Sequence, residues 1–158
     1  WAAAPGTMRD YHDNEWGMPV RGESALFERL TLEAFQSGLS WRIILDKREG
    51  FRRAFVGFDA EAVAEFEPPV VDDLMQDAGI VRNRRKIEAV VANAPVFIDI
   101  VEEHGSFRKY LDFIGSAEDF EGAAEALAER FTHLGPASAG YFLYSCGWRR
   151  QEGAKTAA

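Results

Sequence analysis

Residues 32–41 read LEAFQSGLSW and join two predicted helices. The first helix is predicted to begin at Ser24, whose side-chain oxygen is suited to cap the free amides of a first turn. Gly38 is predicted to end it, because glycine readily adopts the left-handed conformation that a helix stop requires. Ser40 is placed to cap the second helix. An acid, Glu33, a short loop and a large aromatic side chain are therefore expected at one helix junction.

This junction has the composition of a small binding pocket. Glu33 interrupts the apolar character of the first helix, and Trp41 opens the second. A carboxylate beside an aromatic plate suits a flat, electron-poor or cationic ligand. The alternative is that Trp41 belongs to the core and that Glu33 lies at its edge, since buried aromatic side chains usually serve packing. This stretch alone leaves both interpretations open.

The composition predicts one helical domain over residues 1–158. An apolar content of 47%, with 13% aromatic residues, is sufficient for a core and argues against disorder. Cys146 is the single cysteine, which excludes an intrachain disulfide and is typical of a reducing compartment. No apolar run approaches the ~20 residues of a membrane-spanning helix. We therefore expect a monomeric cytoplasmic protein that does not bind membranes.

The charges are unevenly distributed along the chain. A net charge of −8 argues against nucleic-acid binding by the surface as a whole, because affinity for DNA depends on neutralising phosphates. However, nine of the 18 basic residues fall in two runs, 42–53 and 82–86, whereas acids gather in 59–77 and 118–129. Such a chain is able to bind DNA with one face. Runs of charge are also common on solvated helix faces, so this evidence is weak.

The apolar spacing predicts an all-α fold of about eight short helices around one core. Residues 1–22 show no helical period and are predicted to form an ordered loop. Helices are predicted over residues 24–37, 41–49, 51–56, 59–66, 71–78, 83–105, 107–114, 120–131 and 136–146. Pro68 and Pro69 are expected to break the chain. Pro95 predicts a kink or a split in the longest helix.

A second candidate site is the hairpin in residues 131–147, FTHLGPASAGYFLYSCG. A helix ends at the start of this stretch, and Pro136 opens the next one, where the missing amide proton of proline costs nothing. The amides of Gly135, Ala137 and Ser138 are then free, and a helix N-terminus with free amides binds anions such as a DNA phosphate. An ordinary αα-hairpin is the alternative.

Other catalytic and metal-binding patterns do not occur in the sequence. The histidines are His12, His104 and His133, and neither they nor Cys146 have the spacing of metal ligands. Cys146 lies on an apolar helix face and is predicted to belong to the core. No glycine-rich nucleotide motif occurs.

Five stretches of the chain form a recognisable series. They are YHDNEWG (11–17), ALFERLTLEAFQSGLSW (25–41), KREGFRRAF (47–55), QDAGIVRNRRKIEAVVANA (76–94) and FTHLGPASAGYFLYSCG (131–147). In this order they resemble 3-methyladenine DNA glycosylase I, a bacterial family of helix-hairpin-helix repair enzymes. The resemblance implies the helix-hairpin-helix DNA glycosylase fold, with the hairpin at about 120–147. The tail, 148–158, is not covered and is predicted to be peripheral.

The resemblance implies base-excision repair of duplex DNA and a set of site residues. In this family an alkylated base is flipped from the duplex into a pocket between two helical halves. The position matching Glu33 hydrogen-bonds the amino edge of the base, and the position matching Trp41 stacks on its face. Those matching Tyr11 and Trp1 line the pocket. We therefore expect Glu33, Tyr11 and Trp41 to be the catalytic residues.

Two loops are expected to contact the DNA. Gly38 and Leu39 resemble the family's wedge, which fills the space that the flipped base leaves, a use that would explain an exposed leucine. The hairpin is expected to bind the DNA backbone through Gly135, Pro136, Ala137 and Ser138.

The expected reaction is hydrolysis of the N-glycosidic bond of 3-methyladenine, without a lyase step. Methylation at N3 makes adenine cationic, so stacking on Trp41 is a cation–π contact worth roughly 1–2 kcal/mol when desolvated. Glu33 adds a preference for the charged base. Related glycosylases use an aspartate after the hairpin or a lysine nucleophile at the second hairpin helix. This chain has no aspartate after Asp119, and Ala137 and Ser138 stand at the lysine position.

The resemblance is incomplete at both ends of the chain. The family joins its ends with a zinc ion held by two cysteines and two histidines, of which His12 matches one. The cysteine before the Trp1 position would lie upstream of the first residue, and the segment after the hairpin helix reads GWRRQEGAKTAA instead of the family's Asn-Asp-His pattern. We therefore expect no zinc and no other cofactor. Met8 stands where a tyrosine is common near the pocket.

Three other functions stay open, one of which, a free-nucleobase binder that uses the same pocket, would not need the hairpin. A non-catalytic or weakly active relative would bind alkylated or distorted DNA without excision, and would be expected to have lost Glu33 or Trp41. A helical protein-interaction module would show no salt-dependent DNA binding, whereas an enzyme that uses residues 82–86 and the hairpin loses affinity as salt rises. For Glu33, the structural alternative is a hydrogen bond to a buried Tyr11 hydroxyl.

Overall fold

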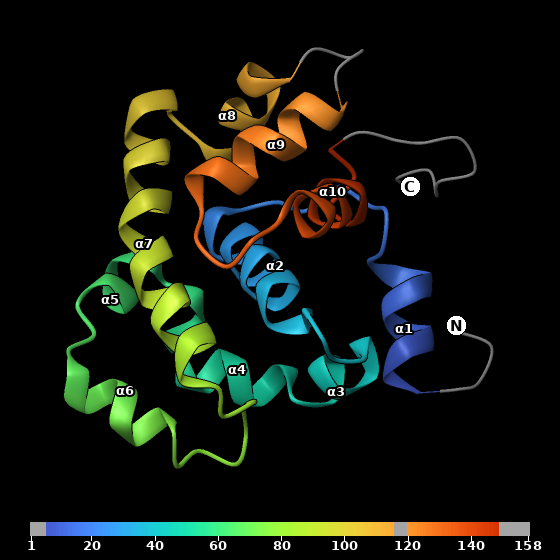
Figure 1. Ribbon diagram of the computed structural model, residues 1–158. Helices are drawn as coiled ribbons and strands as arrows, with labels where there is room; N and C mark the ends of the chain where they lie inside the picture. The colour runs from blue at the N-terminus through green and yellow to red at the C-terminus, as the bar shows by residue number, and fades with distance from the viewer. Residues whose placement is uncertain (1–5, 116–119, 149–158) are drawn as a thin grey trace.

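The computed structural model describes residues 6–115 and 120–148, and within these ranges it is built from helices (Figure 1). The helices are α1 (Thr7–Asn14), α2 (Glu23–Gln36), α3 (Trp41–Asp46), α4 (Arg48–Ala54), α5 (Ala60–Ala64), α6 (Pro68–Leu74), α7 (Arg84–His104), α8 (Phe107–Ile114), α9 (Phe120–Arg130) and α10 (Pro136–Ser145). A 3-10 turn, η1, covers Val56–Phe58. The all-α prediction is confirmed, with ten α-helices in the described ranges instead of about eight.

Helix α2 lies in the middle of the molecule, with α7 on one side and α1 on the other (Figure 1). Every residue of α2 from Leu26 to Phe35 is buried, including its polar ones. Such a helix is enclosed on all sides by others. Aromatic contacts from its neighbours complete this core, for example Phe27 with Phe97 at 5.1 Å between ring centroids.

The junction at residues 36–41 forms largely as its sequence predicts. Gly38 has a φ of 78°, the left-handed conformation expected of a helix stop. The Ser40 hydroxyl accepts a hydrogen bond from the amide of Ile43 at 3.4 Å and caps α3. Ser24 is not a cap, because the chain turns earlier, at Gly22, and α2 begins at Glu23.

Several predicted boundaries were wrong for identifiable reasons. Helix α1 was missed because Tyr11 is its one buried residue, which leaves no apolar period to detect. The predicted helix 41–49 is two helices that meet at Lys47. The helical run breaks before Pro68 and Pro69, as expected, but these two prolines begin α6 instead of preceding it, since the first turn of a helix needs no amide donor there. Pro95 does not split α7, and its exposed position leaves the unmade hydrogen bond facing water.

Helices α9 and α10 form the predicted hairpin, and residues after it pack onto the core. Cys146 is fully buried, as predicted. Trp148 was assigned to a peripheral tail, but it packs against the core and its indole N–H donates to Asp112 at 3.0 Å. The predictions for Trp1 and for 149–158 lie outside the described residues. Within the described ranges, no helix combines the length and apolar character that crossing a membrane requires.

Candidate active site

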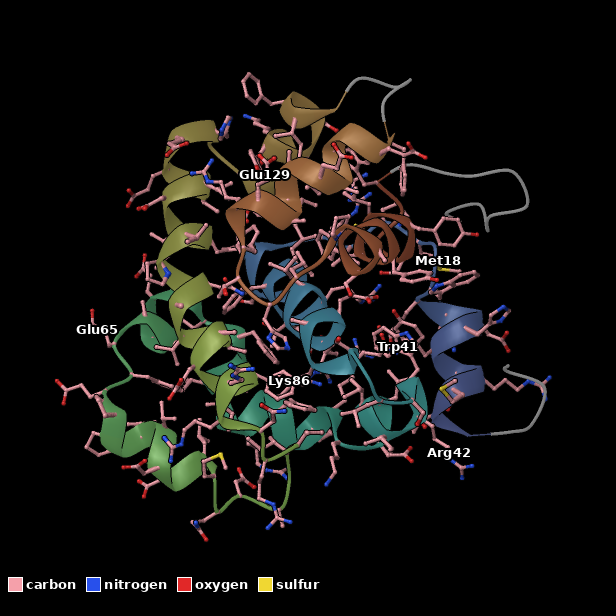
Figure 2. The ribbon with its side chains drawn as sticks, viewed as in Figure 1. Met18, Trp41, Arg42, Glu65, Lys86 and Glu129 are labelled. Carbon is pink, nitrogen blue, oxygen red and sulfur yellow. The ribbon has the colours of Figure 1, made fainter. Side chains whose placement is uncertain are left out.

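Three of the predicted pocket residues come from three different helices and meet beside α2. Tyr11 of α1 stacks on Trp41 of α3, with the ring centroids 5.7 Å apart and the planes inclined by 23°. Glu33 of α2 is 1% exposed and lies close enough to Tyr11 for its charge to affect the tyrosine pKa. Figure 2 shows Trp41, which is half-buried, between α2 and α1.

Across residues 6–115 and 120–148, four buried side-chain polar atoms have no hydrogen-bond partner, and two of them are Nε of Arg29 and Nε of Arg48. The other two are the hydroxyl oxygen of Tyr11 and Oε2 of Glu33. Ser145 lies close enough to lower the tyrosine pKa, but its hydroxyl donates to the Phe142 carbonyl at 3.0 Å and makes no regular bond to Tyr11. The structural alternative, a hydrogen bond between Glu33 and Tyr11, is therefore wrong. Leaving a buried polar group unpaired costs about 1–3 kcal/mol. A ligand that hydrogen-bonds to these two atoms would remove that cost.

Burial determines the charge state of this pair. It raises the pKa of Glu33 to about 8, although the positive charge of Arg29 opposes the shift. Glu33 is consequently mostly protonated at neutral pH in the free protein. Burial likewise raises the pKa of Tyr11 to about 12, so its hydroxyl stays a proton donor. A cation placed beside Glu33 would favour the carboxylate form.

A network of ion pairs beneath Tyr11 was missed from the sequence. Arg48 donates twice to Glu15, both times at 2.7 Å, and once to Glu28 at 3.1 Å. Arg29 donates to Glu15 at 3.3 Å and to the carbonyl of Ser145 at 3.0 Å. These bonds join α1 and the end of α10 to α2 and α4.

The same network fixes the position of the Tyr11 ring. The guanidinium carbons of Arg29 and Arg48 lie 5.0 and 5.9 Å from the ring centroid, within the range of a cation–π contact. The signal in the sequence was the adjacent pair Glu28-Arg29 among the apolar residues of α2. Once the helix is enclosed by others, a buried acid and a buried base on it pair with residues that are distant in the sequence. Sequence spacing does not reveal which residues these partners are.

Two hydrogen bonds between Gln36 and Leu39 hold the loop that contains Gly38 and Leu39. The amide of Leu39 donates to the Gln36 carbonyl at 2.7 Å, and the Gln36 side chain donates to the Leu39 carbonyl at 2.7 Å. Gly38 is exposed. Leu39 was expected to be exposed but is half-buried, because it packs against the edge of the core.

The hairpin turn presents the first turn of α10 to solvent. Gly135, Pro136 and Ala137 are exposed, and Ser138 is half-buried. The left-handed residue of this turn is His133, with a φ of 58°, whereas Gly135 has an ordinary φ of −78°. A Cβ atom added to Gly135 would meet nothing within 4 Å. The fold itself therefore does not require glycine at this position.

Comparison with known proteins identifies the family. A family model described as methyladenine glycosylase matches residues 1–136. The chain belongs to the methyladenine glycosylase family. It is 41% identical over 116 residues to DNA-3-methyladenine glycosylase 1 of Escherichia coli (strain K12), a match that covers 73% of this chain and 60% of that protein. The chain thus spans about three fifths of the length of the curated relatives that it matches.

Solved structures of methyladenine glycosylases share the fold. A crystal structure of 3-methyladenine DNA glycosylase I has a TM-score of 0.85 at 31% identity and covers 100% of this chain and 98% of that one. A structure of 3-methyladenine DNA glycosylase I from Staphylococcus aureus, which concerns recognition of 3-methyladenine, has a TM-score of 0.83 at 31% identity and covers 92% and 87%. The predicted family and helix-hairpin-helix fold are confirmed.

The two basic runs of the chain do not face solvent throughout. The side chain of Arg42 is 80% exposed, and Arg85 is also exposed. Arg48 instead belongs to the ion-pair network, with a side chain that is 15% exposed. Lys86, which was assigned to a DNA-binding run, is 7% exposed and bonds the protein backbone. Its charge is therefore used inside the fold.

The zinc ligands expected of the family do not assemble in the part of the chain that is described. Across residues 6–115 and 120–148, no three or more histidine, cysteine, aspartate or glutamate residues are grouped so that they could hold a metal. Nδ1 of His12 lies 3.0 Å from the Asp13 carboxylate, and its ring stacks on Trp16 at 5.5 Å. Cys146 is buried in the core. These residues do not fit a four-ligand zinc site.

Proposed function

We propose that this chain is a monofunctional DNA glycosylase that hydrolyses the N-glycosidic bond of 3-methyladenine in duplex DNA. The observation that carries the proposal is the pair of buried, unpartnered polar atoms on Tyr11 and Glu33 beside the Trp41 ring. Relatives named DNA-3-methyladenine glycosylase support it, as does a neighbouring structure concerned with 3-methyladenine recognition.

The two unpartnered atoms match one edge of adenine. That edge presents an amino group as donor and N7 as acceptor. Glu33 accepts from the amino group, and the Tyr11 hydroxyl, which stays protonated, donates to N7. Each bond gives a hydrogen-bond partner to a buried atom that otherwise has none. The bound base therefore removes the free-energy cost of leaving these two atoms unpaired.

The stacking geometry limits where the base lies. Two stacking contacts need about 7 Å, so the 5.7 Å between Tyr11 and Trp41 leaves no room for a ring between them. At a contact distance of about 3.5 Å, this centroid separation means that the two rings are offset, which leaves part of the Trp41 face uncovered. A base stacked on that part lies edge to edge with Tyr11, where its N7 meets the hydroxyl.

The charge of Glu33 supplies the preference for an alkylated base. At pH 7 a pKa of about 8 means that ionising Glu33 costs about 1.4 kcal/mol. A cationic base offsets this cost, because it lowers the carboxyl pKa and gains a charge-assisted hydrogen bond of about 1.5–3 kcal/mol. Neutral adenine does not lower the Glu33 pKa in this way and does not offset the cost of ionising Glu33, so the pocket favours the methylated base.

The bond cleavage then needs little assistance. When the bond between C1′ and the base nitrogen breaks, its electron pair neutralises the cationic base, and the sugar becomes an oxocarbenium ion. Water adds to C1′ and loses a proton, which leaves an intact abasic strand and free 3-methyladenine. Ala137 and Ser138 provide no amine to attack C1′, so no covalent intermediate and no strand cleavage follow.

The DNA is held by two loops. The open first turn of α10 binds a backbone phosphate through the amides at Gly135, Ala137 and Ser138, next to Pro136. Leu39, carried by the turn at Gly38, moves into the space that the flipped base leaves. We propose that the protein works as a monomer on DNA in the cytoplasm. We also propose that neither DNA binding nor base release uses a metal, and the lack of grouped metal ligands in the described ranges supports this second proposal.

Release of free base from methylated duplex DNA tests this proposal. Wild-type protein should release 3-methyladenine and leave the strand uncut, and Trp41→Ala should reduce the release at least tenfold. DNA binding without release would support the non-catalytic damage binder instead. Neither release nor salt-dependent DNA binding would refute both DNA functions and favour a protein-interaction module.

A further inference from the structure

Helix α7 carries two buried polar residues that contact the two DNA-facing loops. Lys86 is 7% exposed and Asn93 is 5% exposed. They are seven positions apart, so they lie on one face of the helix, about 10 Å apart along its axis. Neither residue contacts the Tyr11–Glu33–Trp41 group through a hydrogen bond, since their partners are backbone atoms elsewhere.

Lys86 binds the end of α2. Its Nζ donates to the carbonyl of Phe35 at 2.7 Å and to that of Ser37 at 2.6 Å. Carbonyls in the last turn of a helix have no partner within the helix, and a cation there also interacts favourably with the helix dipole. Gly38 follows directly. Figure 2 shows Lys86 on α7 beside this end of α2.

Asn93 binds the hairpin turn at two points. Its Nδ2 donates to the Thr132 carbonyl at 3.0 Å, and its Oδ1 accepts from the Thr132 amide at 2.9 Å. This pair of bonds fixes the orientation of the chain directly before His133, the left-handed residue of the turn. Both polar groups of the asparagine side chain are used, so a side chain without an amide group loses at least one bond.

We infer that Lys86 and Asn93 are positioning residues that hold the Gly38–Leu39 loop and the hairpin turn at a fixed spacing on one rigid helix. The inference rests on the proposed function. A hairpin that grips a phosphate sets where the neighbouring nucleotide lies, and the wedge must enter the duplex at that nucleotide. Small errors in such spacing reduce catalysis strongly, because productive geometry is narrow.

The two residues should act on different steps. Loss of the Asn93 clamp loosens the hairpin, which weakens binding of any duplex. Loss of Lys86 frees the end of α2 and its loop, which impairs base flipping after the duplex is bound. A residue that merely stabilises the fold would affect duplex binding, flipping and the base pocket together.

The experiment compares Lys86→Met and Asn93→Ala with the control Glu88→Gln, an exposed position on the same helix. Three quantities are measured: affinity for undamaged duplex, single-turnover base release at saturating methylated duplex, and binding of free 3-methyladenine by tryptophan fluorescence. Asn93→Ala should weaken duplex affinity about tenfold and leave saturated release within twofold. Lys86→Met should slow saturated release at least tenfold and leave duplex affinity within threefold.

Binding of free 3-methyladenine separates positioning from general stability. It should stay within twofold in both variants, and the control should change nothing. A parallel loss of free-base binding, or no change in either variant, overturns the inference. If a variant fails to fold, Lys86→Gln and Asn93→Ser, which each keep one donor, should shift the same quantities in the same direction. A wild type that releases no base refutes the proposed function, whereas an active wild type with unaffected variants refutes only this inference.

Discussion

Replacing Glu33 with glutamine tests the electrostatics of the pocket in the absence of any ligand. Burial holds the Glu33 pKa at about 8 in the folded protein, against 4.5 for an unperturbed side chain. The folded state therefore retains a proton that the unfolded chain releases. Stability is highest below pH 4.5 and falls as the pH rises through 8, which is the sign expected for a raised pKa.

The size of the effect follows from the two pKa values. Linkage gives a loss of about 1 kcal/mol at pH 5, about 3 at pH 7 and nearly 5 above pH 8.5. Glu33→Gln removes this pH-dependent loss while keeping a side chain of similar shape. The variant should match the wild type near pH 5 and exceed it by roughly 4 kcal/mol at pH 8.5, a Tm difference of about 10 °C for a chain of this length.

Thermal melts of both proteins between pH 5 and pH 8.5 measure this difference. Glu125→Gln, an exposed glutamate on α9, serves as the matched control and should track the wild type at every pH. Base release by Glu33→Gln should fall at least tenfold, because the hydrogen bond to a cationic base loses its charge. A Tm difference that does not change with pH would refute the raised pKa, and retained selectivity for the methylated base would refute the role of the charge.

Three further outcomes are expected. Gly135→Ala should leave the Tm within about 2 °C, since a Cβ atom there meets nothing within 4 Å. The variant should nevertheless bind duplex DNA several-fold more weakly, because the added methyl group keeps a phosphate away. Equal affinity of the variant and the wild type would show that the hairpin does not contact the DNA. Gly50→Ala should destabilise the protein by about 2–3 kcal/mol in urea titrations, as its Cβ would lie 2.0 Å from the Gly79 carbonyl oxygen, and an unchanged midpoint would contradict that close approach. Treatment with a chelator should leave both Tm and base release unchanged, whereas a fall in either would reveal a metal.

The parts of the fold that sequence predicted well depend on local chemistry. Ser40 caps α3 and Gly38 adopts a left-handed conformation, because both roles are decided within one turn of chain. The helix predicted to begin at residue 59 is α5, which Asp59 caps through its side chain. Helix α1 escaped prediction because Tyr11 is its one buried residue. Its helical conformation is stabilised by contacts with distant helices, which no local period records.

The residues of the candidate site also divide into those that the sequence predicted and those that depend on tertiary contacts. The resemblance pointed to Tyr11, Glu33 and Trp41, and the structure brings these three together. Residues that act through tertiary contacts were misassigned. Lys86 reads as one more cation in a basic run, but the end of α2 lies against it and removes it from solvent. Arg48 reads the same way and is paired with Glu15, thirty-three positions earlier.

The energetics of Glu33 connect the fold of this chain to its chemistry. Helix α2 is buried from Leu26 to Phe35, so an acid in that part of the helix is desolvated, and Glu33 has no cationic hydrogen-bond partner to compensate for that. By contrast, Glu28 on the same helix is fully engaged by Arg48 and Arg52. A chain selected for stability alone would pair or replace Glu33, since an unpaired buried acid is costly. Under the proposed function, this cost is offset when a cation with a free amino group binds, so the residue that destabilises the fold is also the one proposed to select the ligand.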